Sequence, residues 1–510
     1  MRTRIFIAVL SLIVLLSVFS GCGRSNTPKD TAAETGAPST ESAAPAESTA
    51  AVSADPLKVT FLYLADENPR MKEYLSNELK DQLKKDLNLE LEVQFLPWSA
   101  YGPGQKVDMM IAAGEPFDMA MTDHNWLNQD VQKKMVYDLT ELVDKYAPDL
   151  KANMDKEAFE NYTFDGKLYA LPVGGKPTSS SFYSICVRQD ILEEVGMSEI
   201  TSIADLEKFA DLAKAKHPDM YATTDYNMEE YMRGYTDKLY TTSYSINGVM
   251  ADETDGTLLP VLGSDVFKAH VDFMNRLYKK GLIPKDILTN KTTNPFETGK
   301  YLWFRGTCGT TKIENEPRLK QNVPTAATKE YIFNPTAPKF KTAYESTAFM
   351  VPSYSKNAEA VVKLVNYMQK GADQYNLFVY GVKDKDYKMV GDKVERTTKT
   401  DFFYNWMLFN IKFPVFESNI PDDYIETYKH WDDNAVASKW LGFSTNLDPI
   451  KTEKAKIDAT WQERVYPMLA GLISYDKGFE TAKKELDNAG WEKYFTELQK
   501  QFADYQATRK

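Results

Sequence analysis

The side chains best suited to chemistry in this sequence are polar and aromatic residues, most of which follow predicted strands. They are Asp66, Glu67, Trp98, Asp123, Asn125, Trp126, Arg305 and Trp406. Carboxylates, amides and guanidinium groups form hydrogen bonds with hydroxyl groups, and an indole ring packs against the apolar face of another ring. These residue types favour noncovalent binding of a hydroxyl-rich molecule. The alternative for each charged residue is a solvated loop, and for each tryptophan it is packing in the core.

The sequence shows no catalytic constellation. The four histidines lack metal-ligand spacing, and the HExxH and Gly-x-Ser-x-Gly motifs do not occur. Ser353–Lys356 and Ser474–Lys477 fit Ser-x-x-Lys, but the companion Ser-Asp-Asn and Lys-Thr-Gly motifs are missing. We therefore expect no catalytic residue, no metal and no cofactor. A carboxylate pair for glycoside hydrolysis remains the enzyme alternative, because its separation in space cannot be read from a sequence.

The N-terminus has the pattern of a secretion signal. Arg2 and Arg4 precede an uncharged run from Ile5 to Phe19, and small residues follow it. A membrane-spanning helix needs about 20 apolar residues, so this run is short for one. Residues 1–21 are therefore predicted to be a signal peptide.

Cys22 stands where the apolar run ends. Ser20-Gly21-Cys22 resembles the lipobox of bacterial lipoproteins, in which the cysteine is acylated and becomes the first residue of the mature chain. We therefore expect Cys22 to be the lipidation site. Residues 22–56 are rich in Ala, Ser, Thr, Glu and Pro, contain no aromatic residue, and predict a disordered linker.

Composition narrows the partners and the architecture. The 510 residues carry a formal net charge of −12, which argues against nucleic acid as a partner, since that would require a basic face. The length suggests two or three domains or two large lobes. Cys186 and Cys308 could pair in an oxidising compartment, but a chain of this length needs no disulfide to be stable, and the question stays open.

Strands and helices alternate from residue 57 to residue 122. "LKVTFLYLA" (57–65) and "LELEVQFLP" (89–97) predict strands, a third strand ends near Thr122, and helix-period stretches separate them. This alternation predicts a parallel sheet, and ligands of such sheets bind beyond the carboxyl ends of the strands. The residues after the first and third strands are therefore expected at one edge, with Trp98 nearby.

The α/β pattern restarts after residue 172. "SFYSICVRQDIL" predicts a strand, and Ser202 caps a helix with Asp205 three residues later. Another strand ends near Arg305, and a further strand leads into a helix that begins at about Lys356. The remainder is mostly helical and aromatic, with a C-terminal helix whose apolar face, Trp491 to Tyr505, predicts packing.

Four segments in this order resemble those of a known family. "GEPFDMAM" resembles a helix-to-strand step, "DGKLYALPVG" a first crossing between lobes, "FETGKYLWFRG" a second-lobe strand, and "ESTAFMVPSYSKNAEAVVKLVNYM" a return crossing with its helix. The chain is thus similar to extracellular solute-binding proteins of the family 1 type, which are lipoprotein receptors of bacterial ABC importers and share the layout of maltose-binding proteins.

The C-terminal part resembles a narrower group. "DFFYNWMLFN", "SKWLGFSTNLDPIKTEKAKI" and "AGWEKYFTELQKQFADYQ" look like the extra C-terminal domain of unknown function in lipoproteins from Gram-positive soil bacteria of the Paenibacillus kind. That subgroup is associated mainly with complex carbohydrates and their oligosaccharides.

The resemblance implies a two-lobed α/β fold, the periplasmic-binding-protein-like type II fold, with a hinge and a largely helical C-terminal extension. The implied parts are lobe 1 at 57–172, lobe 2 at 173–347, a helical return to lobe 1 at 348–440, and a helical region at 441–510 packing on the lobes. The implied partners are an oligosaccharide bound by hinge closure, the transmembrane subunits of an ABC permease, and the outer face of the cell membrane through the lipid anchor.

The resemblance also bears on individual residues. Maltose-binding relatives place polar sugar contacts at the positions of Asp66 and Glu67, whereas "RGTCG" stands where relatives often carry a second-lobe tryptophan. A peptide is the alternative ligand within the receptor class. A surface-tethered glycan hydrolase is the alternative outside it.

Overall fold

The computed structural model describes most of the chain after residue 54. The described residues are 55–102, 104–173, 184–242, 246–290, 295–306, 311–341, 347–398, 402–408, 410, 412 and 416–508, without the side chains of residues 125, 314 and 406. The predicted signal peptide, residues 22–54 of the predicted linker, Cys22 and Cys308 lie outside them, as do the side chains of Asn125 and Trp406. Residues 54–510 form one compact unit, which holds every described hydrophobic cluster and can therefore fold by itself.

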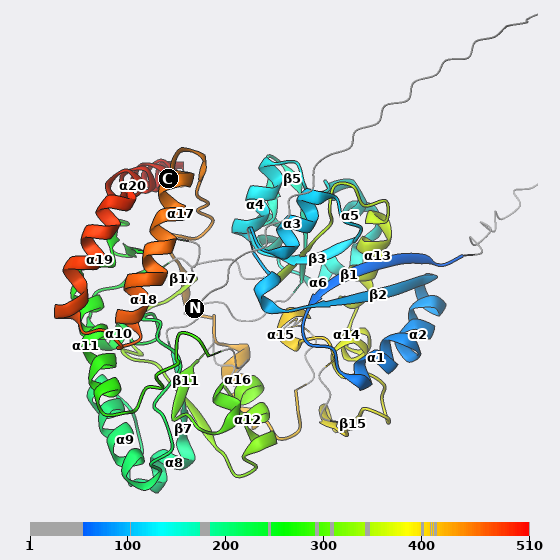
Figure 1. The fold of residues 1–510 in the computed structure, drawn as a ribbon. Helices are drawn as coiled ribbons and strands as arrows, with labels where there is room; N and C mark the ends of the chain where they lie inside the picture. Colours follow the sequence, from blue (N-terminus) through cyan, green and yellow to red (C-terminus); the bar gives the residue numbers. More distant parts are fainter. Residues whose placement is uncertain are drawn as a thin grey trace, which may run out of the picture. The chain divides into compact units, whose positions relative to one another are not determined.

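A five-stranded sheet forms the centre of the first lobe (Figure 1). Its order is β2 (Leu89–Leu96), β1 (Leu57–Leu64), β3 (Met119–Thr122), β14 (Thr347–Met350) and β6 (Ala170–Val173). β1 pairs in parallel with β2 and β3, whereas β14 pairs antiparallel with β3 and β6. The parallel strands predicted from the sequence are confirmed. The carboxyl ends of β1, β2 and β3 therefore share one edge of the sheet.

Helices cover this sheet because their apolar sides face it. α13 (Ala358–Met368) packs on β1 and β6, and its buried residues recur at helical spacing. The other first-lobe helices are α1 (Pro69–Ser76), α2 (Glu78–Leu87), α3 (Lys106–Ala113), α4 (His124–Gln132), α5 (Thr140–Tyr146), α6 (Pro148–Asn153), α7 (Lys156–Glu160), α14 (Ala372–Val379) and α15 (Asn405–Leu408). The helix α16 (Asp422–Lys429) lies beside the second lobe (Figure 1), where its Tyr424 hydroxyl accepts a hydrogen bond from the backbone N–H of Lys312. Two hairpins, β4–β5 (Thr163–Phe164, Lys167–Leu168) and β15–β16 (Tyr387–Val390, Lys393–Arg396), complete the lobe.

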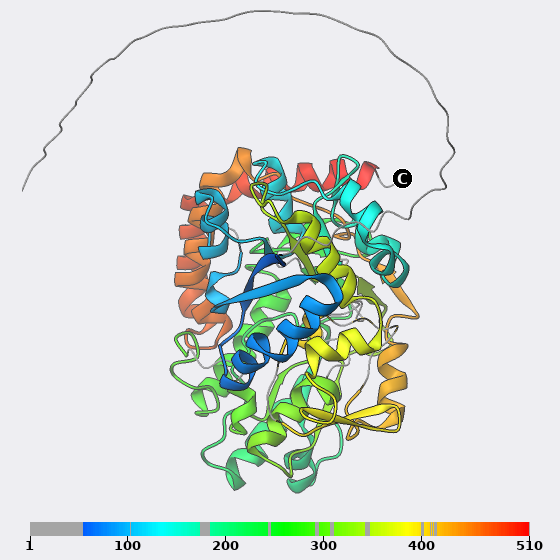
Figure 2. The same ribbon diagram turned by 90° about the vertical axis from the view of Figure 1, so that its right-hand side faces the viewer.

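Segments distant in the sequence lie side by side in the first lobe. In Figure 2 the blue helices α1 and α2 lie next to the yellow segment that contains α14 and the β15–β16 hairpin. Arg70 of α1 joins them, because its Nε and Nη2 donate to the two oxygens of Asp386 at 2.9 and 2.7 Å. The side chain of Asp386 is fully buried. Residues between 358 and 428, which follow β14, thus contribute to the same hydrophobic core as β1.

The second lobe has its own small sheet. β7 (Ile185–Arg188) lies between β11 (Trp303–Arg305) and β12 (Thr328–Tyr331), and both pairings are antiparallel. The predicted cap is confirmed, because the Ser202 hydroxyl accepts a hydrogen bond from the backbone N–H of Asp205 at the start of α9 (Ile203–Lys216). Other elements are α8 (Gln189–Glu194), α10 (Met232–Tyr235), α11 (Asp265–Lys279), η2 (Pro295–Thr298), the π turn η3 (Thr311–Asn315), α12 (Glu316–Asn322), and a sheet of β8 (Tyr240–Thr242), β9 (Val249–Asp252) and β10 (Leu258–Pro260).

The C-terminal helices share a core with the second lobe. One hydrophobic cluster contains residues from Met228 to Val271 and from Trp440 to Phe502. The first lobe contacts this region through a hydrogen bond from Asn128 to Ser444. The elements here are β17 (Ala435–Ala437), which pairs with β13 (Lys339–Lys341), then η4 (Asp448–Ile450), α17 (Lys451–Thr460), η5 (Trp461–Val465), α18 (Tyr466–Leu469), α19 (Tyr475–Ala489) and α20 (Trp491–Thr508). The predicted packing role of the C-terminal aromatic face is confirmed, since Tyr494, Leu498 and Phe502 are buried.

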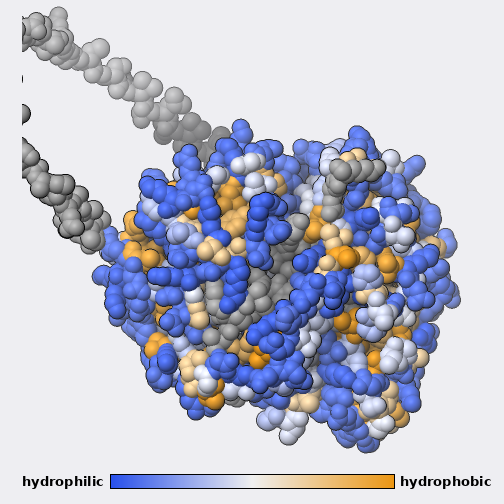
Figure 3. All heavy atoms as spheres, turned by 180° about the vertical axis from the view of Figure 1, so that it is seen from behind, coloured by the Kyte–Doolittle hydropathy of each residue, from blue (hydrophilic) through white to orange (hydrophobic). Residues whose placement is uncertain are grey.

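The visible surface is mainly hydrophilic. On the face in Figure 3, hydrophilic residues cover most of the described surface, and hydrophobic residues form small areas between them. Among the described helices, none is both long enough and apolar enough to cross a bilayer.

Cys186 is a buried free thiol, and burial raises its pKa to about 12.

Candidate functional site

Four side chains form a cluster beyond β2 and β3, which we call the rim cluster. It comprises Trp98, Tyr101, Asp123 and Trp126. Trp98 begins the short helix η1 (Trp98–Ala100) and is 39% exposed. Its ring packs edge-on against the Tyr101 ring, with 6.2 Å between the ring centroids. The Tyr101 ring packs edge-on against the Trp126 ring, with 5.0 Å between the centroids. The two inner rings thus support an outer ring that has an accessible face.

Asp123 fixes the geometry of the rim cluster. One carboxylate oxygen caps α4 by accepting from the backbone N–H of Trp126 at 3.0 Å, and the other accepts from the Tyr101 hydroxyl at 2.6 Å. The cap begins the helix directly after β3, so that residue 126 turns inward. Trp126 is consequently 1% exposed and lies in the first-lobe core. In this structure its ring is packed inside the lobe, and the stacking role expected from the sequence stays a prediction.

Asp66 and Glu67 lie at the same edge of the sheet, directly after β1. Both are exposed, and Glu67 pairs with Lys72 at 3.1 Å. The structure therefore brings together Trp98, Asp123 and Trp126, and places the two acidic residues along the edge without holding them in the cluster. Tyr101, which connects the cluster, was missed by the sequence reasoning. Its spacing of three from Trp98 was the available signal.

Arg305 ends β11 in the second lobe and is half-buried beside carboxylates. Burial raises the pKa of Asp225, while the charge of Arg305 and a hydrogen bond from its backbone oppose that rise. Burial also raises the pKa of Glu229 and, to a larger extent, that of Glu230. The guanidinium lies 5.7 Å from the centroid of the Phe304 ring. Arg305 thus lies near buried acidic groups of its own lobe.

A cavity of about 350 Å³ lies where the two lobes meet, and we call it the interlobe pocket. Both lobes line it, with charged, amide, hydroxyl and aromatic groups. The lining residues are Ile313, Pro317, Arg318 and Gln321 from the second lobe, and Arg396, Thr397, Thr398, Phe403, Tyr404, Asn405, Glu417 and Asn419 from the first.

The interlobe pocket adjoins the carboxyl end of β1. The hydroxyl of Tyr63, near the end of that strand, accepts a hydrogen bond from the backbone N–H of Tyr404 at 2.8 Å, and the two rings lie 5.7 Å apart. On the opposite wall, Ile313 of the second lobe is buried in the first-lobe hydrophobic cluster. The pocket thus occupies the sheet edge at which α/β proteins bind ligands.

Sequence reasoning named no residue of this lining. The segments from 396 to 419 belong to a hairpin, loops and one short helix, so they carry no hydrophobic period. The one signal was the aromatic segment "DFFYNWMLFN", which contains Phe403, Tyr404 and Asn405. Trp406, predicted from the same segment, lies outside the described side chains.

The chemistry of the interlobe pocket suits binding. Its volume lies within the usual range for small-molecule sites, and its amides, hydroxyls and charged groups can pair with many hydroxyl groups at once. Within the described residues, no group of three or more His, Cys, Asp and Glu side chains could hold a metal ion.

Comparison with protein families gives two matches. The model described as bacterial extracellular solute-binding protein matches residues 67–375, and a domain of unknown function, DUF3502, matches residues 439–507. The second match coincides with the helices that share a core with the second lobe.

One curated relative is similar over nearly its whole length. A carbohydrate ABC transporter substrate-binding protein of Streptococcus pneumoniae serotype 4 (strain ATCC BAA-334 / TIGR4) is 27% identical over 482 residues, which cover 90% of this chain and 93% of the relative.

Two solved structures show the same fold. The N-glycan transport solute-binding protein NgtS of Streptococcus pneumoniae superposes with a TM-score of 0.72 at 23% identity, covering 89% of this chain and all of that one. The S. pneumoniae substrate-binding protein FusA, solved with kestose, gives a TM-score of 0.60 at 17% identity, covering 89% of this chain and all of FusA.

Proposed function

Because this chain belongs to the family of bacterial extracellular solute-binding proteins, we propose that it captures an oligosaccharide and delivers it to an ABC importer. The observation that carries this proposal is the interlobe pocket, in which both lobes contribute polar groups beside aromatic rings at the carboxyl edge of the sheet. The relatives support the same ligand class, since one is named for carbohydrate transport and NgtS for N-glycan transport.

Hinge closure follows from a pocket with two walls. A ligand that contacts Arg318 on one lobe and Tyr404 on the other gains contacts only when the lobes approach each other. It therefore stabilises the closed arrangement by its greater affinity for that state. The permease then distinguishes the loaded receptor from the empty one by this arrangement.

We further propose that Cys22 holds the protein at the outer face of the membrane. Acyl chains add roughly 0.8 kcal/mol per buried methylene, so two or three of them anchor a domain without a spanning helix. Residues 22–56 would let the body reach the permease. Cys22→Ala is expected to move the protein from the membrane fraction to the medium, whereas Ser25→Ala is expected to leave it in the membrane fraction. A Cys22→Ala protein that is still acylated would contradict the anchor.

Binding without turnover is the proposed mode of action. The curated relative is a transport protein by name, and family membership favours the same for this chain. A receptor returns its ligand unchanged, whereas a glycan hydrolase would release shorter products. The state of the recovered glycan therefore separates the two functions.

The test is thermal unfolding of residues 54–510 against a panel of neutral and acidic oligosaccharides, with short peptides as controls. A ligand at 100 times its dissociation constant should add about 2.7 kcal/mol to the free energy of unfolding, which raises the midpoint measurably. We expect a shift with one glycan class and recovery of that glycan intact. Shifts with peptides alone, or cleavage of the glycan, would overturn the proposal.

A further inference from the structure

The interlobe pocket contains two guanidinium groups. Arg318 comes from α12 in the second lobe, and Arg396 is the last residue of β16 in the first. Glu417 is the one carboxylate among the described lining residues. The lining residues themselves therefore carry one net positive charge, with the Glu297 carboxylate beside Arg318 just outside the lining, although the whole chain has a formal net charge of −12. General composition does not account for this local excess.

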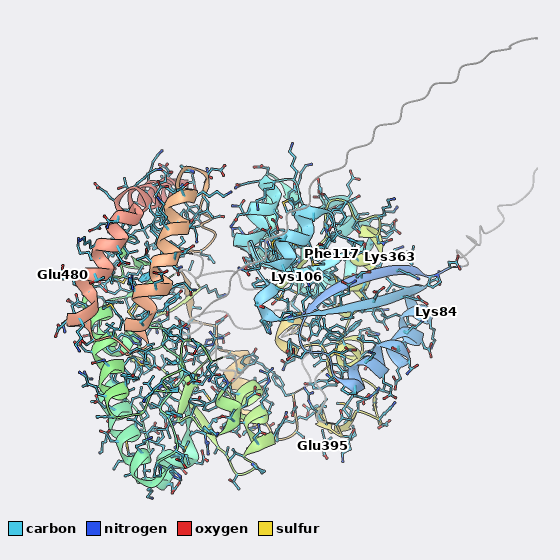
Figure 4. All side chains as sticks on the ribbon, viewed as in Figure 1. Lys84, Lys106, Phe117, Lys363, Glu395 and Glu480 are labelled. Atoms are coloured by element: carbon cyan, nitrogen blue, oxygen red, sulfur yellow. The ribbon has the colours of Figure 1, made fainter. Side chains whose placement is uncertain are left out.

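Arg396 is held against the wall of the pocket. Its Nε donates to Glu417 at 2.8 Å, and its guanidinium lies 4.9 Å from the centroid of the Tyr380 ring. Alternation along β16 sends the preceding residue, Glu395, outward, as Figure 4 shows, and Arg396 to the opposite side. Because the planar group is already oriented, a ligand loses less entropy by ordering it.

Arg318 has a weaker ion pair than Arg396. Its Nε lies 3.9 Å from the carboxylate of Glu297, which is too long for a hydrogen bond, and its side chain is 23% exposed. An anionic group that entered the pocket could approach this guanidinium more closely than Glu297 does. The side chain comes from the lobe opposite Arg396, so such a ligand would link the two lobes.

From this geometry we infer that the interlobe pocket selects a carbohydrate that carries a carboxylate, as a uronic acid does, with Arg318 and Arg396 as its anion contacts. The inference rests on the proposed function and specifies the charge of the oligosaccharide. The planar fork of a guanidinium matches a carboxylate in a two-bond arrangement, and such charge-assisted hydrogen bonds are stronger than neutral ones. A carboxylate would also neutralise the excess charge of the lining.

The test compares uronic-acid trisaccharides with their methyl esters, which keep the size and the hydroxyl groups but lose the negative charge. Calorimetric titration of residues 54–510 is expected to show at least about tenfold tighter binding of the acid. Arg318→Gln should remove this difference between acid and ester, and Arg318→Lys should restore part of it. The matched control is Arg464→Gln, because Arg464 pairs with Glu485 in the C-terminal helices, away from the pocket.

Each contrary result has a defined meaning. Equal binding of acid and ester, or an acid preference that survives in Arg318→Gln, would overturn the inference while the receptor function stands. Preference for a sulfated trisaccharide over the uronate would overturn the carboxylate assignment. Binding of no glycan would remove the proposed function as well. Circular dichroism of each variant confirms that it is folded.

Discussion

In the rim cluster the Tyr101 ring lies between Trp98 and Trp126. We expect mutation of Trp98 to affect glycan binding and mutation of Trp126 to affect stability. Trp98 is 39% exposed, so Trp98→Ala is expected to leave the free energy of unfolding nearly unchanged and to weaken glycan binding by about 1–2 kcal/mol, roughly tenfold. Trp126 is 1% exposed, and Trp126→Ala should cost about 3–5 kcal/mol of stability. Urea unfolding and calorimetric titration measure the two effects.

The reverse pattern would reassign the two residues. A Trp98→Ala protein that keeps its full glycan affinity would place the ligand away from the rim cluster. A Trp126→Ala protein as stable as the wild type would show that its ring is not part of the core.

A second residue-scale feature is a pair of neighbouring carboxyl groups, Asp108 on α3 and Asp130 on α4. Asp130 is fully buried, and neither of its carboxyl oxygens accepts a hydrogen bond from a donor in the described chain. Its cationic neighbour, Lys133, is at 4.0 Å. Burial first, and then the charge of Asp108, raise the pKa of Asp130 to about 7. Around neutral pH this group therefore keeps a proton that an exposed aspartate would lose.

The raised pKa predicts a loss of stability as pH rises. An unfolded aspartate has a pKa of about 4, so between about pH 4 and pH 7 the folded state binds a proton that the unfolded state has released. The stabilisation is complete below pH 4 and is lost as pH rises through about 7. Asp130→Asn removes the ionisation, and the variant should exceed the wild type at pH 8 by about 2–4 kcal/mol and differ little at pH 4.

Urea unfolding at pH 4.5, 6 and 8 measures this prediction. Glu395→Gln, a change at an exposed carboxylate, is the control and should follow the wild type at each pH. An Asp130→Asn curve parallel to that of the wild type would show that Asp130 is ionised in the folded protein throughout.

At the scale of elements, the sequence identified those with a clear period and missed those without one. β1 and β2 are runs of β-branched, aromatic and alternating residues, and both lie where expected. The Ser202 cap and the apolar face of α20 were also predicted correctly from the sequence. The first-lobe lining of the interlobe pocket comes mostly from loops and a hairpin, where tertiary contacts, such as that of Arg396 with Glu417, set the conformation. Hydrophobic periodicity in a sequence does not predict such contacts.

α20 should matter for the stability of the second lobe, because it fills part of that core. The centroid of the Phe502 ring lies 4.8 Å from that of Trp440 and 5.0 Å from that of Phe443. Phe502 is 2% exposed. Phe502→Ala is expected to cost about 3–5 kcal/mol in urea unfolding. Lys500→Ala, an exposed change on the same helix, is the control. Equal stability of the two variants would mean that α20 is dispensable.

At the scale of the whole molecule, the chain passes between the lobes more than once. Apart from Ile313, the first-lobe cluster contains residues up to Val173 and again from Ala348 to Tyr428. The second-lobe clusters contain residues between Val173 and Ala348 and residues from Trp440 onward. The sequence led us to expect residues 441–510 to pack on the lobes, and their described hydrophobic packing is with the second lobe. Hydropathy identifies which face of a helix is buried, but it does not identify the partner.

A two-lobed receptor with a ligand between its lobes should become more compact on binding. Small-angle X-ray scattering of residues 54–510 is expected to give a smaller radius of gyration with a saturating glycan than without it. A tetrapeptide is the control and should leave the radius unchanged. A glycan that binds with no change in radius would place the site within one lobe.

The core shared by residues 228–271 and 440–502 also affects how the protein is made. A ribosome adds about 5–20 residues per second, so roughly 10–30 seconds separate the two halves of this core as the chain emerges. During that time the apolar surface of residues 228–271 is exposed to solvent. Exposed apolar surface of this kind binds chaperones or promotes aggregation. A message cut short after residue 440 would therefore yield a chain with an unfinished second lobe, not a slightly shorter receptor.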